Sequence, residues 1–524
     1  MISRILFNSL LFSPAVIVTT LFLSSSKVTA EVSAAVAQVT SVSQLSDVQP
    51  SDWAFDALQS LVERYGCIAG YPNGTYRGNR TMTRYEFAAG LNACLDRVNE
   101  LIATATADLV TKEDLATFQK LREEFSAELA TLRSRVDALE MRTAELEANQ
   151  FSTTTKLTGE AIFAVAGVFG EEAADEDDNG NNNPDLQDNI IFANRVRLNF
   201  DTSFTGKDLL RTRLQTKNIT EFQGDVTGTR MTRLGFDGDE DNRVSIDDLY
   251  YYFPIGDRVR VTVAAAETEM TDIAETLSPV SSASSGAISR FGRYNPIYRT
   301  NDGTGFGINY EFSDRASLTF AYMVSDAEDP AKKNGLFDGN YSALAQVLFA
   351  PIKNLDIGLT YVHSYYAGGS NSGVNLTGST GSDNARRPFD NVATSADSFG
   401  LETSWRISPQ FTVSGWLGYS FAHSEVSDDN ADILNYAVTL AFPDLGGKGN
   451  LAGIVIGMPP KVTESSLVAD RDTSLHIEGF YRFKLTDNIT ITPGLFVITN
   501  PEHNDNNDNN DSIFVGTMRT TFKF

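Results

Sequence analysis

The last stretch of the chain, Ser512 to Phe524, reads SIFVGTMRTTFKF and decides the fold. With a period of two, one face carries Phe514, Gly516, Met518, Thr520, Phe522 and Phe524, and the other carries Ile513, Val515, Thr517, Arg519, Thr521 and Lys523. Both charges therefore lie on one side of a strand whose other side is apolar. A barrel that pairs its last strand with its first leaves no exposed edge, so we expect a closed barrel. The alternative is the last strand of a soluble sandwich.

Composition fits a large barrel with an additional segment. The chain has 524 residues, with 68 acidic and 42 basic side chains and a net charge of -26. Such an acidic chain is a poor match for nucleic acid, so we expect no nucleic-acid partner. Mean hydropathy is -0.19. Beyond the amino terminus no apolar run approaches the ~20 residues of a spanning helix, but alternating barrel strands do not need one.

Residues 1–30 have the features of a secretory signal peptide. Arg4 supplies the positive start, the segment from Ile5 to Leu23 is mostly apolar, and Val28-Thr29-Ala30 gives a small-residue cleavage site. A retained membrane anchor is the alternative, although Pro14 and several hydroxyl residues dilute the run. Residues 31–42 read as a linker.

Residues 43–107 predict a small helical domain. Asp52 is expected to cap a helix with Trp53 and Leu58 on one face, and Thr83 with Glu86 forms a capping box for a second helix. We expect the buried face of the second helix to contain Phe87, Leu91, Leu95 and Val98.

The chain has two cysteines, Cys67 and Cys94, and both lie in this small domain. Because the chain is exported, a single disulfide between them is our hypothesis, and two free buried thiols are the alternative.

Residues 108–150 predict a coiled-coil stalk. With Leu115 at a and Phe118 at d, eight of the ten a and d positions through Leu146 are apolar. No Gly or Pro interrupts residues 108 to 150. A coiled coil needs partner chains, so the stalk predicts an oligomer. The alternative is one amphipathic helix packed on the barrel.

From residue 151 to 524 the sequence becomes strands joined by short and long connections that largely alternate. Tight turns on one side and long loops on the other are typical of outer-membrane barrels, and we expect about 16 antiparallel strands. Aromatic girdles are expected near the strand ends, at Phe200, Phe204, Tyr250 to Phe253, Phe320, Tyr322, Tyr361, Trp405, Trp416, Phe480 and Tyr481.

Several strands alternate charged with apolar residues. The charged members are Arg195, Arg197, Arg211, Arg213, Lys217, Arg258 and Arg260. A charge that faces lipid near the midplane costs ~2–4 kcal/mol, so we expect these side chains to line a polar lumen. Asp201, Asp247 and Asp248 are candidates to balance them.

A long connection, Thr268 to Gly303, is expected after the sixth strand. It holds Arg290, Arg293 and Arg299, and Glu267 and Glu269 lie near its start. We hypothesise that the loop folds inward and narrows the pore; an external flap is the alternative.

The remaining motifs do not lead us to predict a metal-binding or catalytic site. Residues Asp237 to Asp248 imitate a calcium loop, but an acidic hairpin is preferred because Asn242 replaces the turn glycine. The four His residues lack zinc spacing, and no nucleophile elbow or phosphate loop is present. We expect neither an enzyme nor a cofactor nor a resident metal.

The small domain at residues 43–107 resembles an S-layer homology domain. The resemblance rests on Asp47-Val48, Trp53-Ala54, the run from Gly66 to Arg77, and Thr83-Arg84-Tyr85-Glu86. It implies binding to peptidoglycan-linked polysaccharide, with Trp53, Tyr71, Arg77, Arg84 and Glu86 as the candidate residues. For Trp53 a place in the core is the preferred interpretation, and for Arg84 it is glycan binding.

The barrel region resembles the carbohydrate-selective porin family (OprB type) through RVRLNFDTSFTGKDLLRTRLQTKN at Arg195 to Asn218 and DDLYYYFPIGDRVRV at Asp247 to Val261. Its ending is similar to the terminal strand of bacterial outer-membrane barrels, in which a final Phe belongs to the assembly signal. The whole chain resembles the cyanobacterial outer-membrane porins of the iron-uptake type. That resemblance implies a homotrimer in outer-membrane lipid, with the amino-terminal domain in the periplasm, and passive passage of small ions or sugars. The rival function is a structural tether whose barrel is plugged.

Overall fold

The computed structural model describes residues 39–68, 70–71, 73–104, 112–149, 154–174, 184–370, 372–504 and 512–524. The predicted signal peptide and most of the predicted linker lie outside these residues. The chain divides into two compact units, Met1–Glu145 and Leu146–Phe524.

The first unit begins with a small core around η3 (Val42–Gln44), α1 (Phe55–Gln59) and the helical turn η4 (Ser60–Arg64). Val42, Leu45, Leu58 and Val62 are buried together. The predicted cap is wrong by two residues, because Ala54 occupies the position before α1 and Asp52 accepts a hydrogen bond from the Gln49 amide instead.

Helix α2 (Arg84–Thr104) begins at the predicted capping box. The Thr83 amide donates to Glu86, and the Glu86 amide donates to the Thr83 hydroxyl. The predicted buried face is wrong for Phe87, Leu91 and Leu95, which are exposed. The small core contains none of these three side chains, so they face outward.

Helix α3 (Lys112–Asn149) is one continuous helix. The apolar residues of its heptad stripe are exposed in the single chain: Leu115, Phe118, Phe125, Leu132, Val136 and Leu139. Among the described residues, no helix combines the length and the apolar character that crossing a membrane requires.

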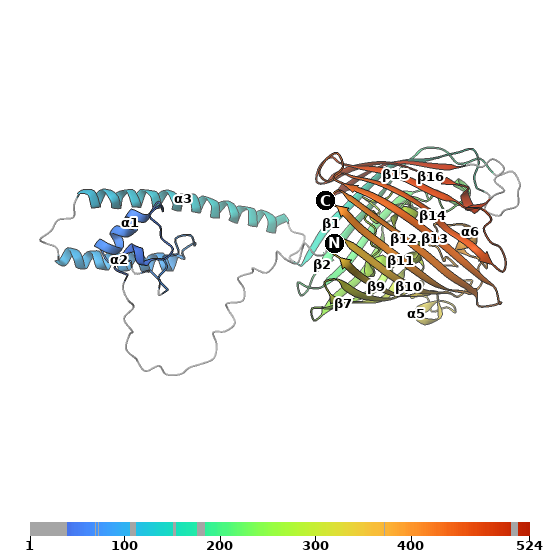
Figure 1. Ribbon diagram of the computed structural model, residues 1–524, viewed down its shortest axis with the longest axis horizontal. Coiled ribbons are helices and arrows are strands. Elements are labelled where there is room, and N and C mark those ends of the chain that lie inside the picture. The colour runs from blue at the N-terminus through green and yellow to red at the C-terminus, as the bar shows by residue number, and fades with distance from the viewer. Residues whose placement is uncertain are drawn as a thin grey trace, which may run out of the picture. The chain divides into compact units, whose positions relative to one another are not determined.

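The second unit is a closed antiparallel barrel (Figure 1). Its strands are β1 (Thr155–Phe169), β2 (Ile191–Thr202), β3 (Leu209–Ile219), β4 (Gly238–Asp239), β5 (Ser245–Ile255), β6 (Val259–Thr268), β7 (Gly303–Ser313), β8 (Ala316–Val324), β9 (Tyr341–Ile352), β10 (Leu355–Tyr366), β11 (Thr394–Ser408), β12 (Phe411–Ser424), β13 (Asn430–Pro443), β14 (Leu451–Ser465), β15 (Leu475–Lys484), β16 (Ile489–Thr499) and β17 (Ile513–Lys523). Short helical turns lie in the loops: η5 (Gly224–Val226), α4 (Met270–Ile273), η6 (Phe291–Arg293), η7 (Pro296–Arg299), α5 (Gly335–Asp338), α6 (Asp383–Arg386) and η8 (Pro501–His503).

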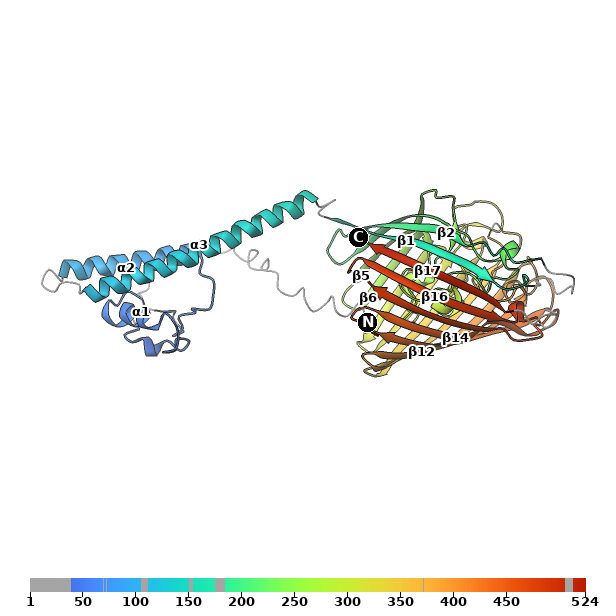
Figure 2. The same ribbon diagram turned by 90° about the horizontal axis from the view of Figure 1, so that it is seen from above.

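Of these 17 strands, β4 has two residues and pairs only at the end of β3, so the wall has 16 strands, as predicted. The last strand pairs with the first from Glu160↔Lys523 to Phe169↔Phe514. Figure 2 shows β1 and β17 side by side at this closing seam. The closed barrel predicted from the last thirteen residues is therefore confirmed.

Side chains alternate between the two faces of the wall. Leu359, Leu401, Leu417 and Tyr436 are opposite one another across β10 to β13, and all four are exposed on the outside. On β17, Phe514 and Met518 are exposed, whereas Arg519 is buried. The outside is thus apolar, and polar side chains such as Arg519 lie inside, which suits lipid around the barrel.

The predicted girdle position is wrong for three of the aromatic residues. Tyr250, Trp416 and Phe480 are buried, and they pack with loop residues inside the barrel. The reason is strand parity: the exposed Leu417 lies next to Trp416, so Trp416 points inward.

Connections at one end of the barrel are short, at residues 203–208, 256–258, 314–315, 353–354, 409–410, 444–450 and 485–488. Connections at the other end are mostly long, at residues 170–190, 220–244, 269–302, 325–340, 367–393, 425–429, 466–474 and 500–512. The connection that follows β14 begins at residue 466, because β14 continues to Ser465. Strand β1 starts at the short-turn end, so the chain enters the barrel from that side.

Candidate functional site

Five of the predicted lumen residues lie on the inner face of β2 and β3, and we call them the arginine ladder: Arg195, Arg197, Arg211, Arg213 and Lys217. Strand register places Arg195 opposite Lys217, Arg197 opposite Gln215 and Asp201 opposite Arg211. The side chains of Arg197, Arg211 and Arg213 are 17–24% exposed, and that of Arg195 is 4% exposed. The structure therefore brings the charged residues of both strands together on one wall.

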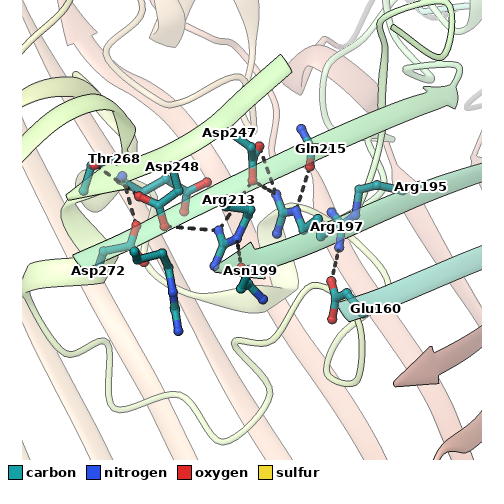
Figure 3. Close-up of polar contacts among 12 residues, drawn as sticks. Glu160, Arg195, Arg197, Asn199, Arg213, Gln215, Asp247, Asp248, Thr268 and Asp272 are labelled. Atoms are coloured by element: carbon teal, nitrogen blue, oxygen red, sulfur yellow. Dashed lines mark hydrogen bonds and ion pairs between the residues drawn. The ribbon is translucent and has the colours of Figure 1, made fainter. Parts of the chain in front are cut away.

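Each member of the ladder has a carboxylate partner. The ion pairs are Arg195–Glu160 (3.1 Å), Arg197–Asp247 (3.1 Å), Arg211–Asp201 (2.8 Å), Arg213–Asp247 and Arg213–Asp248 (both 3.4 Å), and Lys217–Glu240 (3.4 Å). Figure 3 shows how Glu160, Asp247 and Asp248 point toward the arginines. The ladder is a polar wall of nearly balanced charge, with short-range fields between paired groups.

Arg258 and Arg260 lie apart from the ladder, near the short-turn end. Arg260 donates from Nε and Nη2 to Asn309 Oδ1 at 3.1 Å, and its guanidinium carbon lies 5.5 Å from the centre of the Tyr252 ring. Arg258 donates to the Phe312 carbonyl at 3.5 Å. Both side chains are exposed.

The connection between β6 and β7, residues 269–302, lies inside the barrel. Its Tyr298 hydroxyl is 2.8 Å from Thr360 Oγ1 on β10, and its Asn295 donates to Glu402 on β11 at 2.9 Å. The Ile288 amide donates to Glu478 on β15 at 2.6 Å. It follows β6, the sixth strand in chain order, as predicted, and this is the fifth strand of the wall because β4 is not part of it. We call residues 269–302 the inner loop.

The three arginines of the inner loop bond to carbonyl oxygens. Arg290 donates to Gly378 at 2.9 Å, Arg293 to Ser281 at 2.7 Å, and Arg299 to the Arg290 carbonyl at 3.0 Å. Within the part of the chain that the structure describes, no ion pair joins any of the three to a carboxylate. The three arginines therefore lack the one-to-one carboxylate partners of the ladder, and Glu269 is the nearby carboxylate that offsets part of their charge.

Tyr294 contacts two of these arginines and one acid. The guanidinium carbons of Arg299 and Arg293 lie 3.9 and 5.0 Å from the centre of the Tyr294 ring, and the Tyr294 hydroxyl donates to Glu269 at 3.2 Å. Burial alone would raise the pKa of Glu269, but Arg293, Arg299 and Arg290 hold it below its ordinary value. Glu269 is therefore an anion among the loop arginines.

Glu267 does not join this cluster. It is the next-to-last residue of β6, has a φ of 50° and helps to line a separate cavity of about 450 Å³ together with Asp302, Asp326 and Glu328. Of the two acids near the start of the loop, Glu269 therefore lies among the loop arginines, and Glu267 lines this separate cavity.

The calcium-loop reading of residues 237–248 does not match the geometry. Asp237 pairs with Arg233 at 2.8 Å, Asp248 lies 3.4 Å from Arg213, and Asp241 pairs with Arg243 at 3.2 Å. Across the described residues, no group of three or more His, Cys, Asp or Glu side chains is placed to hold a metal ion.

The candidate cell-wall residues lie in the first unit. Arg77 stacks over Tyr71 at 4.6 Å, and the Tyr71 hydroxyl donates to Glu86 at 3.4 Å. Arg84 is exposed, and Trp53 is 64% exposed, so the preferred core position for Trp53 is wrong. The reason is that Trp53 precedes α1 and faces away from the small core. Cys67 and Cys94 form a disulfide.

Several inner residues were missed by sequence reasoning. Arg519, Arg482 and Glu478 contact the inner loop, and Glu160 pairs with the ladder. The signal for Arg519 was its place on the charged face of the last strand, whereas single acids such as Glu478 have no local signal.

Comparison with known proteins agrees with this architecture. The family described as "Carbohydrate-selective porin, OprB family" matches residues 112–524, and "S-layer homology domain" matches residues 44–88. The "Uncharacterized protein alr4550" of Nostoc sp. is 49% identical over 513 residues, which cover 93% of this chain and 86% of the relative. "Outer membrane protein SlpA" of Deinococcus radiodurans is 39% identical over 136 residues, 26% of this chain and 11% of the relative. The solved structure of Pseudomonas putida OprB is 10% identical with a TM-score of 0.49, and the match covers 73% of this chain and 96% of that one.

The family match covers most of the chain, and its relatives extend over nearly all of it. The apolar outer face and the short-turn end fix how the barrel lies in its membrane. The chain belongs to the carbohydrate-selective porin OprB family and is an outer-membrane barrel that carries an S-layer homology domain on its periplasmic side.

Proposed function

We propose that the barrel lets small hydrophilic solutes and inorganic ions diffuse passively across the outer membrane. The observation that carries this proposal is the contrast between the two faces of the wall. Leucines and aromatics cover the outside, and on the inside the arginines of β2 and β3 pair with carboxylates of β5. A wall of that kind suits water in the lumen, because paired charges in an apolar interior would pay a large desolvation cost.

The charge preference of the pore comes from the inner loop. The ladder is compensated pair by pair, whereas Arg290, Arg293 and Arg299 bond to carbonyls and keep their charge. Three arginines beside one carboxylate, Glu269, leave a net positive charge, and a net positive charge in a narrow, water-filled passage favours anions. We therefore propose a preference for small anions over cations at this constriction.

Planar-bilayer recording tests both parts of the proposal. Purified protein in a potassium chloride gradient should give stepwise conductance with a reversal potential of anion-selective sign. The triple substitution Arg290→Gln, Arg293→Gln, Arg299→Gln should shift that potential toward cations. The matched control replaces three compensated positions, Arg197, Arg211 and Arg213, each by Lys, which preserves the charge of the ladder and should leave the sign unchanged.

A plugged, non-conducting tether is the second candidate, and one observation favours it. Met231, Leu234 and Phe236 of the connection after β3 pack inside the barrel against Trp416, Phe480 and Phe496. These apolar side chains fill part of the lumen. Absence of conductance steps from a correctly folded, heat-modifiable barrel would establish the tether and end the channel proposal.

We propose that three chains assemble through α3 and hold the outer membrane to the cell wall. The exposed apolar stripe of α3 keeps heptad spacing, so two further copies of the same helix would cover it. One S-layer homology domain per chain would then give three weak sites for peptidoglycan-linked polysaccharide, whose binding adds through avidity. Trp53, Arg77 and Arg84 are the proposed contacts. Cross-linking of the intact protein tests the trimer, and sedimentation with isolated cell walls tests the binding.

A further inference from the structure

The inner loop contains a short segment whose backbone is held almost entirely by side chains of the barrel wall. Arg519 on β17 donates from Nη1 to the carbonyls of Ala283 (2.8 Å) and Ala287 (3.3 Å), and from Nη2 to that of Gly286 (2.7 Å). Its side chain is fully buried.

Neighbouring wall residues complete the same set. Thr521 on β17 donates to the Ser284 carbonyl at 2.8 Å, and Arg482 on β15 donates to the Ser285 carbonyl at 2.9 Å. Five consecutive carbonyls, from Ala283 to Ala287, therefore each accept from a wall side chain. Glu478 then accepts from the Ile288 amide at 2.6 Å and from the Ser289 amide at 3.4 Å.

This segment lies across the seam where the barrel closes. Register places Ala164 of β1 opposite Arg519 and Ile162 of β1 opposite Thr521. Ile162 and Ala164 belong to the same buried cluster as Ala283 and Ala287 of the inner loop. The loop thus bonds to the last strand and packs against the first.

The turn that presents the carbonyls depends on Gly286. The Gly286 amide donates to Ser282 at 2.8 Å, and the Ala287 amide donates to Val280 at 3.0 Å. A Cβ at residue 286 would lie 2.0 Å from the Val280 carbonyl oxygen, so no larger residue fits without opening the turn. Opening it would move the carbonyls away from Arg519.

A buried guanidinium without an ion pair needs oxygen atoms around it. Within the described residues, Arg519 forms no ion pair with a carboxylate; its two Nη groups donate to three loop carbonyls, and its buried Nε has no hydrogen-bond partner. Its ring contact is Phe236, 5.1 Å from the guanidinium carbon. The Arg519 guanidinium and the loop carbonyls therefore stabilise each other, because each supplies hydrogen-bond partners that the other would lack.

We propose that Arg519 is the positioning residue of the inner loop, and that residues 280–289 with Arg519, Thr521, Arg482 and Glu478 form an internal clasp over the closing seam. The clasp fixes the loop inside the barrel and reinforces the pairing of β1 with β17. Its effect on conductance rests on the proposed channel function, whereas its effect on loop mobility does not.

Thiol labelling tests the clasp without requiring conduction. The two native cysteines are joined in a disulfide, so Ala283→Cys adds a single free thiol at a buried position. In the full-length protein, Arg519→Lys keeps the charge but loses the planar fork. We expect a charged maleimide to label the thiol about tenfold faster for each hydrogen bond lost. Arg258→Lys, at an exposed arginine that does not bond to the inner loop, is the matched control and should leave the rate unchanged.

Gly286→Ala is the second variant and opens the clasp from the loop side. It should raise the labelling rate and lower the temperature at which the barrel unfolds on a detergent gel, as Arg519→Lys should. An unchanged labelling rate in both variants, with folded barrels, would overturn the clasp. Faster labelling in a barrel that never conducts would support the clasp and refute only the channel.

Discussion

The buried pair Arg195–Glu160 gives a quantitative test of where the ladder points. Its Nη2 and Oε1 atoms are 3.1 Å apart, and the Arg195 side chain is 4% exposed. Glu160→Gln keeps the shape and removes the negative charge, so the guanidinium is left buried without a counter-charge. Breaking one side of a buried pair costs about 3–5 kcal/mol of the free energy of unfolding. The double variant Glu160→Gln with Arg195→Met should recover most of that loss.

The control for this prediction is an ion pair of similar distance on the surface. Arg243 and Asp241 are 3.2 Å apart, and both side chains are 80% exposed. Arg243→Gln should therefore change the free energy of unfolding by less than about 1 kcal/mol. Urea unfolding in detergent micelles, followed by the mobility shift of the folded barrel, measures both effects.

The sign of the stability change that follows from replacing Arg195 alone shows whether this side chain faces the lumen or lipid. If Arg195 faced hydrocarbon, Arg195→Leu would stabilise the barrel by about 2–4 kcal/mol. With Arg195 inside, the same change leaves Glu160 unpaired and destabilises the barrel. A stabilised Arg195→Leu variant, or a Glu160→Gln variant that unfolds like the parent protein, would refute the assignment of the inner face.

Three further predictions concern the loops and the first unit. The disulfide closes a loop with a sequence separation of 27, so Cys67→Ser with Cys94→Ser should lower the stability of the helical domain by about 3–4 kcal/mol in thermal unfolding followed by circular dichroism. Burial raises the pKa of Glu502 from 4.5 to about 8, and its carboxyl accepts from the Asp383 amide at 2.6 Å. Since the folded state favours the protonated acid, its contribution to stability is present below about pH 4.5 and is lost as the pH rises toward 8; Glu502→Gln should flatten the dependence of the melting temperature on pH over that range. Arg84→Gln should weaken sedimentation with isolated cell walls by about tenfold and leave the barrel folded.

Each of these has a result that would count against it. Unchanged unfolding of the reduced variant would mean that the disulfide does not constrain the domain. A pH dependence that survives Glu502→Gln would assign the effect to other acids, such as Asp470. Normal sedimentation of the Arg84 variant would move glycan binding to other residues.

The strand pattern was predictable because period-two alternation is local. Phe514 and Met518 outside, and Arg519 inside, follow directly from the last thirteen residues. The lumen position of the ladder followed from the same parity. Trp416 was assigned to the girdle from its residue type. The alternation along the strand places the neighbouring Leu417 outside and would have placed Trp416 inside.

The clasp was not predictable from sequence, because its partners are distant along the chain. Arg519 and Gly286 are 233 residues apart, and Glu478 and Ile288 are 190 apart. No periodicity marks such contacts, and their partners are backbone carbonyls that every residue has. Trp53 and Phe87 were misplaced for a related reason: an apolar side chain indicates a covered face, but not whether its own domain or another chain covers it.

Alternate residues of one wall strand meet water and lipid, and the channel depends on this alternation. Arg260 and Val261 are neighbours on β6. Strand pairing places Arg260 opposite Asn309 and Val261 opposite Ile308 on β7, so each pair belongs to one face of the wall. Single-channel recording before and after a charged thiol reagent compares Arg260→Cys with Val261→Cys in the otherwise unchanged protein. We expect the reagent to change the conductance of the Arg260→Cys channel and to leave that of Val261→Cys unaltered. Equal responses at both positions, or no conducting channel in either, would contradict it.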